Sequence, residues 1–121
     1  MPKTDVVLFA ENDSSSPLLE WLDKLPEKAR NKCIVKIERL AEMGHALRRP
    51  DADILRDGIY ELRIGLQGIQ YRMLYFFHGK QAVLSHGLIK KGDQMPPMEI
   101  ERAMECKSRF IKNPQKHIYG G

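Results

Sequence analysis

The chain has little cysteine, no long apolar run and no clustered pattern of metal ligands. Only two cysteines, Cys33 and Cys106, occur among the 121 residues, each within a helical pattern and without a second ligand at metal-like spacing. This usage argues against a disulfide framework and a zinc site, and favours buried thiols. The apolar stretch over residues 6–10 is far too short for a signal-peptide core or a membrane span. We therefore expect a cytoplasmic protein with no metal or cofactor.

The chain also lacks internal repeats and low-complexity segments, and its composition is that of a globular protein. Apolar residues make up 42% and charged residues 30% of the sequence. A chain of 121 residues is long enough to bury a core and too short for two ordinary domains. The sequence therefore predicts one domain over residues 1–121.

Positive charge is concentrated in one part of the chain. Residues 54–91 hold six Lys/Arg against two Asp/Glu, which equals the whole formal excess of +4, whereas residues 1–53 and 92–121 are nearly balanced. Cations placed on otherwise apolar strands without acidic partners suggest a polyanionic partner. The sequence pI near 9.1 favours nucleic acid or an acidic protein for the same reason.

Turn and cap signals divide the chain into elements. Ser16 before Pro17 is typical of a helix start, and Pro26 must interrupt that helix because it lacks a backbone donor. From Ile59 onward the apolar period changes to two, which indicates strands. The predicted elements are a strand at 5–10, a helical pair at 17–43, a three-stranded meander at 58–89, a C-terminal helix at 97–112 and a flexible tail at 113–121.

This order predicts an α+β fold, β-α-α-β-β-β-α, in which the antiparallel meander is covered by the N-terminal helix pair. The stretch from His45 to Asp53 is interpreted as a connector. The last helix is amphipathic and is expected to pack near a sheet edge or on a second protein.

Within the meander, cations and not acid–base pairs are the candidate chemistry. Arg72 shares a strand face with Leu74 and Phe76, and a cation is costly to cover without a purpose. Arg63 alternates away from Leu62 and is expected beside Arg72 on the neighbouring strand. No His/His or Glu/His pair is evident among these strands.

Two adjacent lysines follow at the end of the last predicted strand. If that strand continues through Lys90 and Lys91, their side chains point to opposite faces, so only one of them enters a site. A lysine near other cations supplies a neutral amine more readily and can carry a proton, whereas an arginine holds phosphate but transfers protons poorly. His86 is a second possible proton carrier.

Each of these residues also has a purely structural interpretation. Arg63 can be a cross-strand ion pair, and the two lysines can simply protect a strand end. Tyr60 is explained as readily by packing as by stacking on RNA. His86 before Gly87 suits a hydrogen-bonded structural histidine.

The segment from Leu55 to Phe110 resembles the phage-derived Gp49-like, HigB-like branch of the RelE/ParE toxin superfamily. The residues that carry the resemblance are Asp57-Gly58-Ile59-Tyr60-Glu61-Leu62-Arg63, Tyr71-Arg72, His86-Gly87, Lys90-Lys91, Pro96, Glu99-Ile100 and Ala103. No single one of them is specific, but the ordered set at this spacing is.

The resemblance implies a RelE-like fold and the toxin of a type II toxin-antitoxin system. It implies a metal-independent endoribonuclease that cuts messenger RNA on the translating ribosome, with Arg72, Lys90 and Lys91 as catalytic residues and Arg63, Tyr60 and His86 in RNA binding. The implied partners are a helix-turn-helix antitoxin, mRNA on the ribosome, and operator DNA only through the antitoxin. Two alternatives stay open: a non-catalytic inhibitor of a protein such as DNA gyrase, and a nucleic-acid-binding adaptor.

Overall fold

Prolines set the boundaries of the first two helices. In a computed structural model that describes residues 3–120, α1 (Pro17–Asp23) begins after Ser16, whose Oγ accepts a hydrogen bond from the Leu19 amide at 3.2 Å. Pro26 separates α1 from α2 (Glu27–Met43). Both the helix start and the interruption agree with the sequence prediction.

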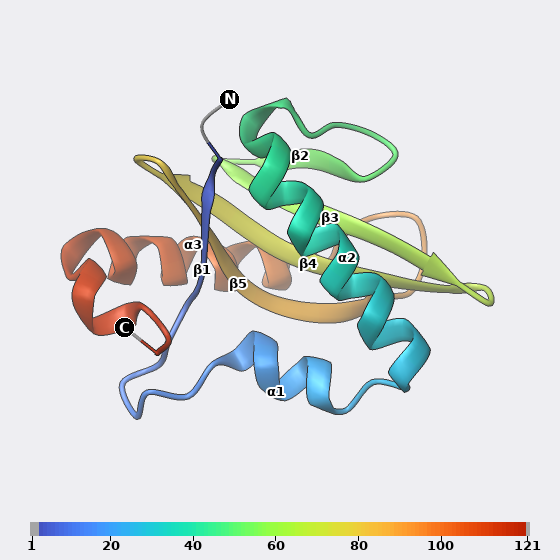
Figure 1. Cartoon of the computed structure of the whole chain (residues 1–121), viewed down its shortest axis with the longest axis horizontal. Helices are drawn as coiled ribbons and strands as arrows, with labels where there is room; N and C mark the ends of the chain where they lie inside the picture. Colours follow the sequence, from blue (N-terminus) through green and yellow to red (C-terminus); the bar gives the residue numbers. More distant parts are fainter. Residues whose placement is uncertain (1–2, 121) are drawn as a thin grey trace.

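The remaining elements complete an α+β fold whose order is shown in Figure 1. They are β1 (Asp5–Leu8), η1 (Gly44–Ala46), β2 (Ala52–Arg56), β3 (Ile59–Leu66), β4 (Ile69–His78), β5 (Gln81–Lys90), α3 (Pro97–Lys112) and η2 (Pro114–His117). None of the helices in residues 3–120 is both long enough and apolar enough to cross a membrane.

The strands form one mixed sheet of five, in the order β1-β5-β4-β3-β2. The predicted meander is confirmed, because β3, β4 and β5 pair antiparallel in sequence order. β1 pairs parallel to β5, with Asp5 opposite Gln81. β2 pairs antiparallel to β3 through residues that were predicted to be partly a connector, so the sheet has one more strand than expected.

Helices cover both faces of this sheet: the N-terminal pair covers one face as predicted, and α3 covers the other instead of packing near an edge or on a second protein. In Figure 1, α2 lies in front of the strands, α1 lies below β5 and α3 lies behind the sheet; α1 and α2 pack on the same core. The reason is that β4 carries apolar side chains on both faces, and Leu74 and Phe76 need a cover of their own. The stripe on α3 supplies that cover, so this helix belongs to the domain core.

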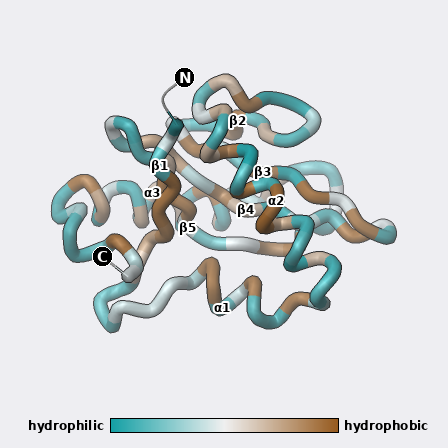
Figure 2. Tube along the Cα trace, in the orientation of Figure 1, coloured by the Kyte–Doolittle hydropathy of each residue, from teal (hydrophilic) through white to brown (hydrophobic). Residues whose placement is uncertain are grey.

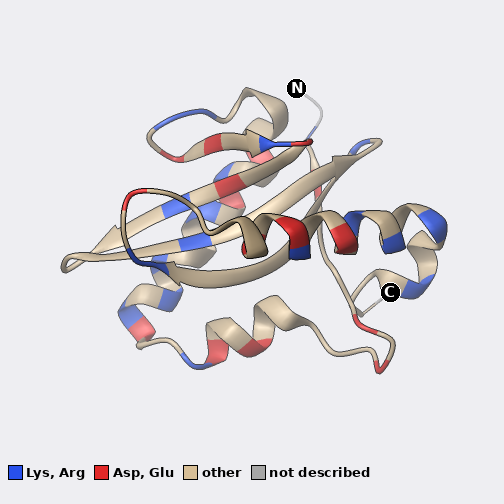
Figure 3. Cartoon of the chain, turned by 180° about the vertical axis from the view of Figure 1, so that it is seen from behind, with Lys and Arg blue, Asp and Glu red and all other residues tan. Residues whose placement is uncertain are grey.

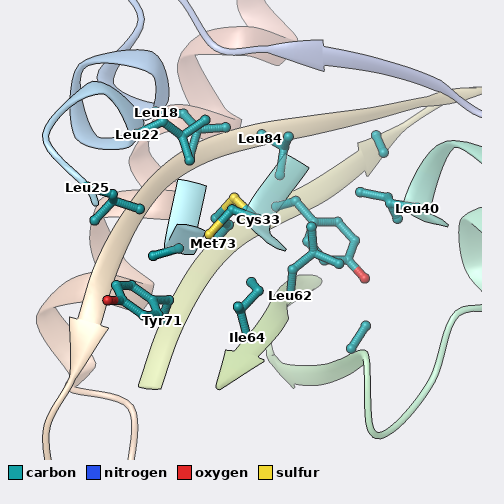
Figure 4. Close-up of a cluster of buried hydrophobic side chains, with 14 of the residues drawn as sticks. Leu18, Leu22, Leu25, Cys33, Leu40, Leu62, Ile64, Tyr71, Met73 and Leu84 are labelled. Atoms are coloured by element: carbon teal, nitrogen blue, oxygen red, sulfur yellow. The ribbon is translucent and has the colours of Figure 1, made fainter. Parts of the chain in front are cut away.

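Two hydrophobic cores result, one on each face. The first, under α1 and α2, is shown in Figure 4 and includes Leu18, Leu22, Cys33, Leu62, Met73 and Leu84. The second, under α3, is built from Ile59, Leu74, Phe76, Val83, Ile100, Ala103, Cys106 and Phe110. Figure 2 shows hydrophobic and hydrophilic stretches alternating along α1 and α2, as expected of helices that bury one side. Each fully buried large side chain contributes about 1.5–3 kcal/mol to stability.

Both cysteines are free and buried, as the sequence suggested. Burial raises the pKa of Cys33 to about 11. Burial likewise raises the pKa of Cys106, a shift that Ser85 partly opposes through a hydrogen bond. Both thiols are therefore poor nucleophiles, and they act as core residues.

Residues 114–119 of the segment predicted as a flexible tail over 113–121 make defined contacts with the fold. Residues 114–117 form η2, and Phe9 and Ile118 form an isolated antiparallel bridge. His117 is buried, stacks on Phe9 with ring centroids 5.0 Å apart, and contacts the Ala10 carbonyl through Nδ1 at 2.8 Å. This segment completes the sheet edge beside β1. Gly121, the last residue of the predicted tail, lies outside the described residues.

Candidate functional site

The strand register gathers three of the predicted cations on the face of the sheet that α3 covers in part. Arg63 on β3 lies directly opposite Arg72 on β4, as the alternation predicts. Lys90, the last residue of β5, lies opposite Gln70 and therefore on the same face as Arg72. Seen from behind, Lys and Arg lie on the strands beyond the N-terminal end of α3, where the sheet is not overlaid by the helix (Figure 3).

Arg72 is deeply set and partly bonded. Its side chain is only 3% exposed; Nη1 donates to the Tyr71 carbonyl at 2.9 Å and Nη2 donates to Gln70 Oε1 at 2.7 Å. Burial lowers its pKa, Glu61 raises it, and the charge of Arg63 lowers it further. The guanidinium is thus held in a fixed orientation.

Glu61 is a member of this cluster that was not among the predicted site residues. Its side chain is 7% exposed, and each of its two oxygens lies near a different arginine. Oε1 lies 3.4 Å from Arg72 Nε, and Oε2 lies 3.8 Å from Arg63 Nε. Strand alternation alone places Arg63 and Glu61 on the same face. It does not show that this face is covered, which is why the burial of Glu61 could not be predicted.

The arginines open into a hollow of about 420 Å³ at the end of the sheet. Its lining residues are Arg49, Pro50, Arg63, Ile64, Gly65, Gln70 and Arg72. Arg49 was not among the predicted site residues, because it lies in the segment interpreted as a connector. Its side chain is 70% exposed and pairs with Asp53 at 2.7 Å, and its hydrogen bond is the largest cause of the lowered pKa of that carboxyl.

Lys91 does not lie in the strand, as its prediction required. β5 ends at Lys90, and Lys91 is exposed in the segment that follows. The argument that the two lysines point to opposite faces requires a strand that continues, so it does not apply to Lys91. Lys90 is partly buried and is fixed by its pairing with β4.

Tyr60 is not brought together with the arginines. It lies on the opposite face of the sheet, against the core under α2, where its ring stacks on Tyr75 at 5.3 Å and meets Phe77 edge-on at 5.2 Å. The packing interpretation accounts for these contacts. Its role in RNA binding stays a prediction that this placement does not support.

His86 lies on the α3 face but beneath the helix. It is 1% exposed, with Nδ1 at 2.8 Å from Ser85 Oγ and Nε2 at 2.9 Å from Glu99 Oε1. A bulge between β4 and β5 makes Ser85 the extra residue, which turns both Ser85 and His86 toward α3. Burial and the charge of Arg102 lower the His86 pKa, against the opposing effect of Glu99.

The Glu99–His86 contact is a Glu/His pair that the strands alone did not reveal. Glu99 comes from the first turn of α3, so the pair spans two elements. Both ring nitrogens are engaged, which leaves none of them free to meet a phosphate. The structural interpretation of His86 fits this geometry.

Two guanidinium groups side by side, an ammonium on the same face and an open hollow provide what a phosphate backbone needs. Arginine binds phosphate through two parallel N–H donors, and a charged pair stabilises developing negative charge without a metal. Among residues 3–120 no group of three or more His, Cys, Asp or Glu side chains is arranged to hold a metal ion.

Comparison with known protein families gives a match that covers most of the chain. The family model described as "Phage derived protein Gp49-like (DUF891)" matches residues 20–108, from the middle of α1 to the last third of α3. No curated protein matches the chain.

Proposed function

Because the chain belongs to the Gp49-like family, a family of RelE-like toxins, we propose that it is the toxin of a toxin-antitoxin pair and cuts messenger RNA on the translating ribosome. The observation that carries the enzymatic half of this proposal is the Arg63–Arg72 pair beside the hollow. A protein that acts only by covering a target has no need of two aligned guanidinium groups at the floor of an open site.

The proposed reaction is attack of a ribose 2′-oxygen on the adjacent phosphorus. The new P–O bond forms as the bond to the 5′-oxygen breaks, which yields a cyclic phosphate and a free 5′-hydroxyl. Arg72 and Arg63 stabilise the charge that builds on the non-bridging oxygens. Lys90 is the group we assign to moving the proton from the attacking 2′-hydroxyl to the departing 5′-oxygen, because an arginine remains protonated throughout.

The toxin family also implies an antitoxin, which we propose to be a helix-turn-helix protein. The +4 net charge suits an acidic inhibitor as well as RNA. Operator DNA would be reached through that antitoxin alone, because the cationic site is assigned to RNA.

Primer extension on cellular messages after brief expression tests the proposal. We expect new 5′ ends within codons of translated messages, and none on the same messages when their start codons are removed. Growth arrest with intact messages and stalled replication would instead indicate the inhibitor of a protein such as DNA gyrase.

Lys90 and Lys91 should contribute unequally, because only Lys90 is held on the face of Arg72. Lys90→Ala should lower the cleavage rate by about a hundredfold, as expected on loss of a proton-transfer group, whereas Lys91→Ala should lower it only a few-fold through weaker phosphate binding. Single-turnover rates on one RNA substrate measure both. Equal losses would contradict the assignment.

A further inference from the structure

Two polar atoms stand out beside the hollow. Glu61 Oε1 and Arg72 Nε are both buried, and neither has a hydrogen-bond partner among the residues described. They lie 3.4 Å apart, close enough for attraction between the charges but without the geometry of a hydrogen bond. Buried polar atoms left in this state are uncommon and call for an explanation.

A carboxylate is an unfavourable neighbour for a phosphate site. It repels the anion that the two arginines attract, and a glutamine of nearly the same shape would accept hydrogen bonds without that repulsion. Packing alone therefore does not explain the charge of Glu61. Its position does: one oxygen addresses each arginine, at 3.4 Å and 3.8 Å.

Those distances also exceed the length of about 2.7–2.9 Å that is typical of a closed charge-assisted pair. Glu61 therefore lowers the cost of holding Arg72 in a buried position while leaving its donors incompletely satisfied. The same carboxylate sets the orientation of Arg63, which is more exposed and would otherwise move freely.

We propose that Glu61 is a positioning residue, which aligns Arg72 and Arg63 for the phosphate at the expense of binding strength. The predicted effect of Glu61 on cleavage rests on the proposed function, whereas its predicted effect on RNA binding does not. It predicts an unusual combination: removing the charge of Glu61 strengthens RNA binding and slows cleavage.

Glu61→Gln tests the proposal, because it preserves shape and removes the charge. Binding is measured by fluorescence anisotropy with a short single-stranded RNA that is 2′-O-methylated and cannot be cut. We expect about fivefold tighter binding, the effect of about 1 kcal/mol for one charge removed near a phosphate. Single-turnover cleavage of the unmodified RNA should fall about tenfold, as expected when catalytic groups lose alignment.

Glu42→Gln is the matched control. Glu42 is exposed on α2, across the sheet from the hollow, and the substitution changes the net charge by the same amount. It should alter binding less than about twofold, because solvent screens a charge at that distance. Thermal unfolding followed by circular dichroism verifies that both variants fold.

The Nε–Hε signals of Arg72 and Arg63 in NMR spectra give a readout that does not depend on cleavage. Glu61→Gln should broaden or shift both, and Glu61→Asp, which keeps the charge, should leave binding near the wild-type value. Weaker binding in Glu61→Gln, or unchanged arginine signals, would overturn the proposal. So would loss of the acidic limb of the pH–rate profile, which would make Glu61 a general base.

If the wild-type chain cuts no RNA, the proposed function fails. The binding and NMR measurements still test the positioning role of Glu61 in that case. Tighter binding together with altered arginine signals would support the positioning role in a protein that only binds, and the absence of either would refute it.

Discussion

Replacing Arg72 by alanine should lower RNA cleavage by at least about a hundredfold, the usual cost of removing one group that stabilises charge in a transition state. Arg72 lines the hollow, and two of its donors already anchor it to the Tyr71 carbonyl and to Gln70. Its remaining donors are therefore presented in a fixed direction. Single-turnover cleavage of a defined RNA by the purified protein measures the loss.

The same substitution affects stability, and the two effects must be separated. Without Arg72, the carboxylate of Glu61 keeps only its 3.8 Å contact with Arg63, and breaking a buried pair typically costs about 3–5 kcal/mol. Arg72→Lys avoids this loss because it retains the charge, yet it cannot bind phosphate in bidentate fashion. A folded Arg72→Lys protein with impaired cleavage therefore isolates the chemical contribution.

Arg39→Ala is a suitable control for the change in charge. Arg39 is exposed on α2, the helix on the face opposite α3, and contacts Asp51 at 3.3 Å. Cleavage by this variant should stay within about twofold of wild type, since exposed ion pairs contribute little. Undiminished cleavage by Arg72→Ala would contradict the nuclease site, and toxicity without cut messages would move the function to an inhibitor.

Local signals were enough to predict most of the fold. Proline positions fixed the start of α3 at Pro97 and the division between α1 and α2, and short turns fixed the meander. β2 escaped prediction because it is only five residues long and lies at an edge, where pairing with β3 and not its own pattern makes it a strand. The placement of α3 was a matter of tertiary packing, although the apolar residues on both faces of β4 contained the signal.

The site was predictable only as far as strict alternation held. Arg63 and Arg72 meet because the β3–β4 register is regular over their length. His86 follows a bulge, so strict strand alternation did not predict that its side chain lies beneath α3. Arg49 reaches the hollow from a loop, and no periodic pattern reports on such a residue.

Deleting residues 114–121 should destabilise the protein by about 3 kcal/mol. Phe9 is fully buried in the intact chain. The deletion removes the His117 ring that stacks on Phe9 and opens Phe9 to water. It also removes the partners of two backbone groups: Ala10 N–H donates to the His117 carbonyl at 2.8 Å, and Tyr119 N–H donates to the Leu8 carbonyl at 2.9 Å. Burial of one aromatic ring contributes about 1.5–3 kcal/mol and each net hydrogen bond about 1 kcal/mol, before the entropy of ordering the segment is subtracted.

Urea unfolding followed by tryptophan fluorescence measures this loss as a lower midpoint. His117→Ala should produce about half of it, whereas Lys116→Ala, at an exposed neighbouring position, should leave the midpoint unchanged. An unchanged midpoint in the deletion variant would support the flexible tail that the sequence predicted.

Because this segment lies beside β1 and the C-terminal end of α3, away from the loop that leads into α3 from β5 (Figure 1), cleavage by the folded deletion variant should equal that of wild type well below its unfolding temperature. Loss of stability with retained activity would show that the C-terminal residues support the fold and not the Arg63–Arg72 site.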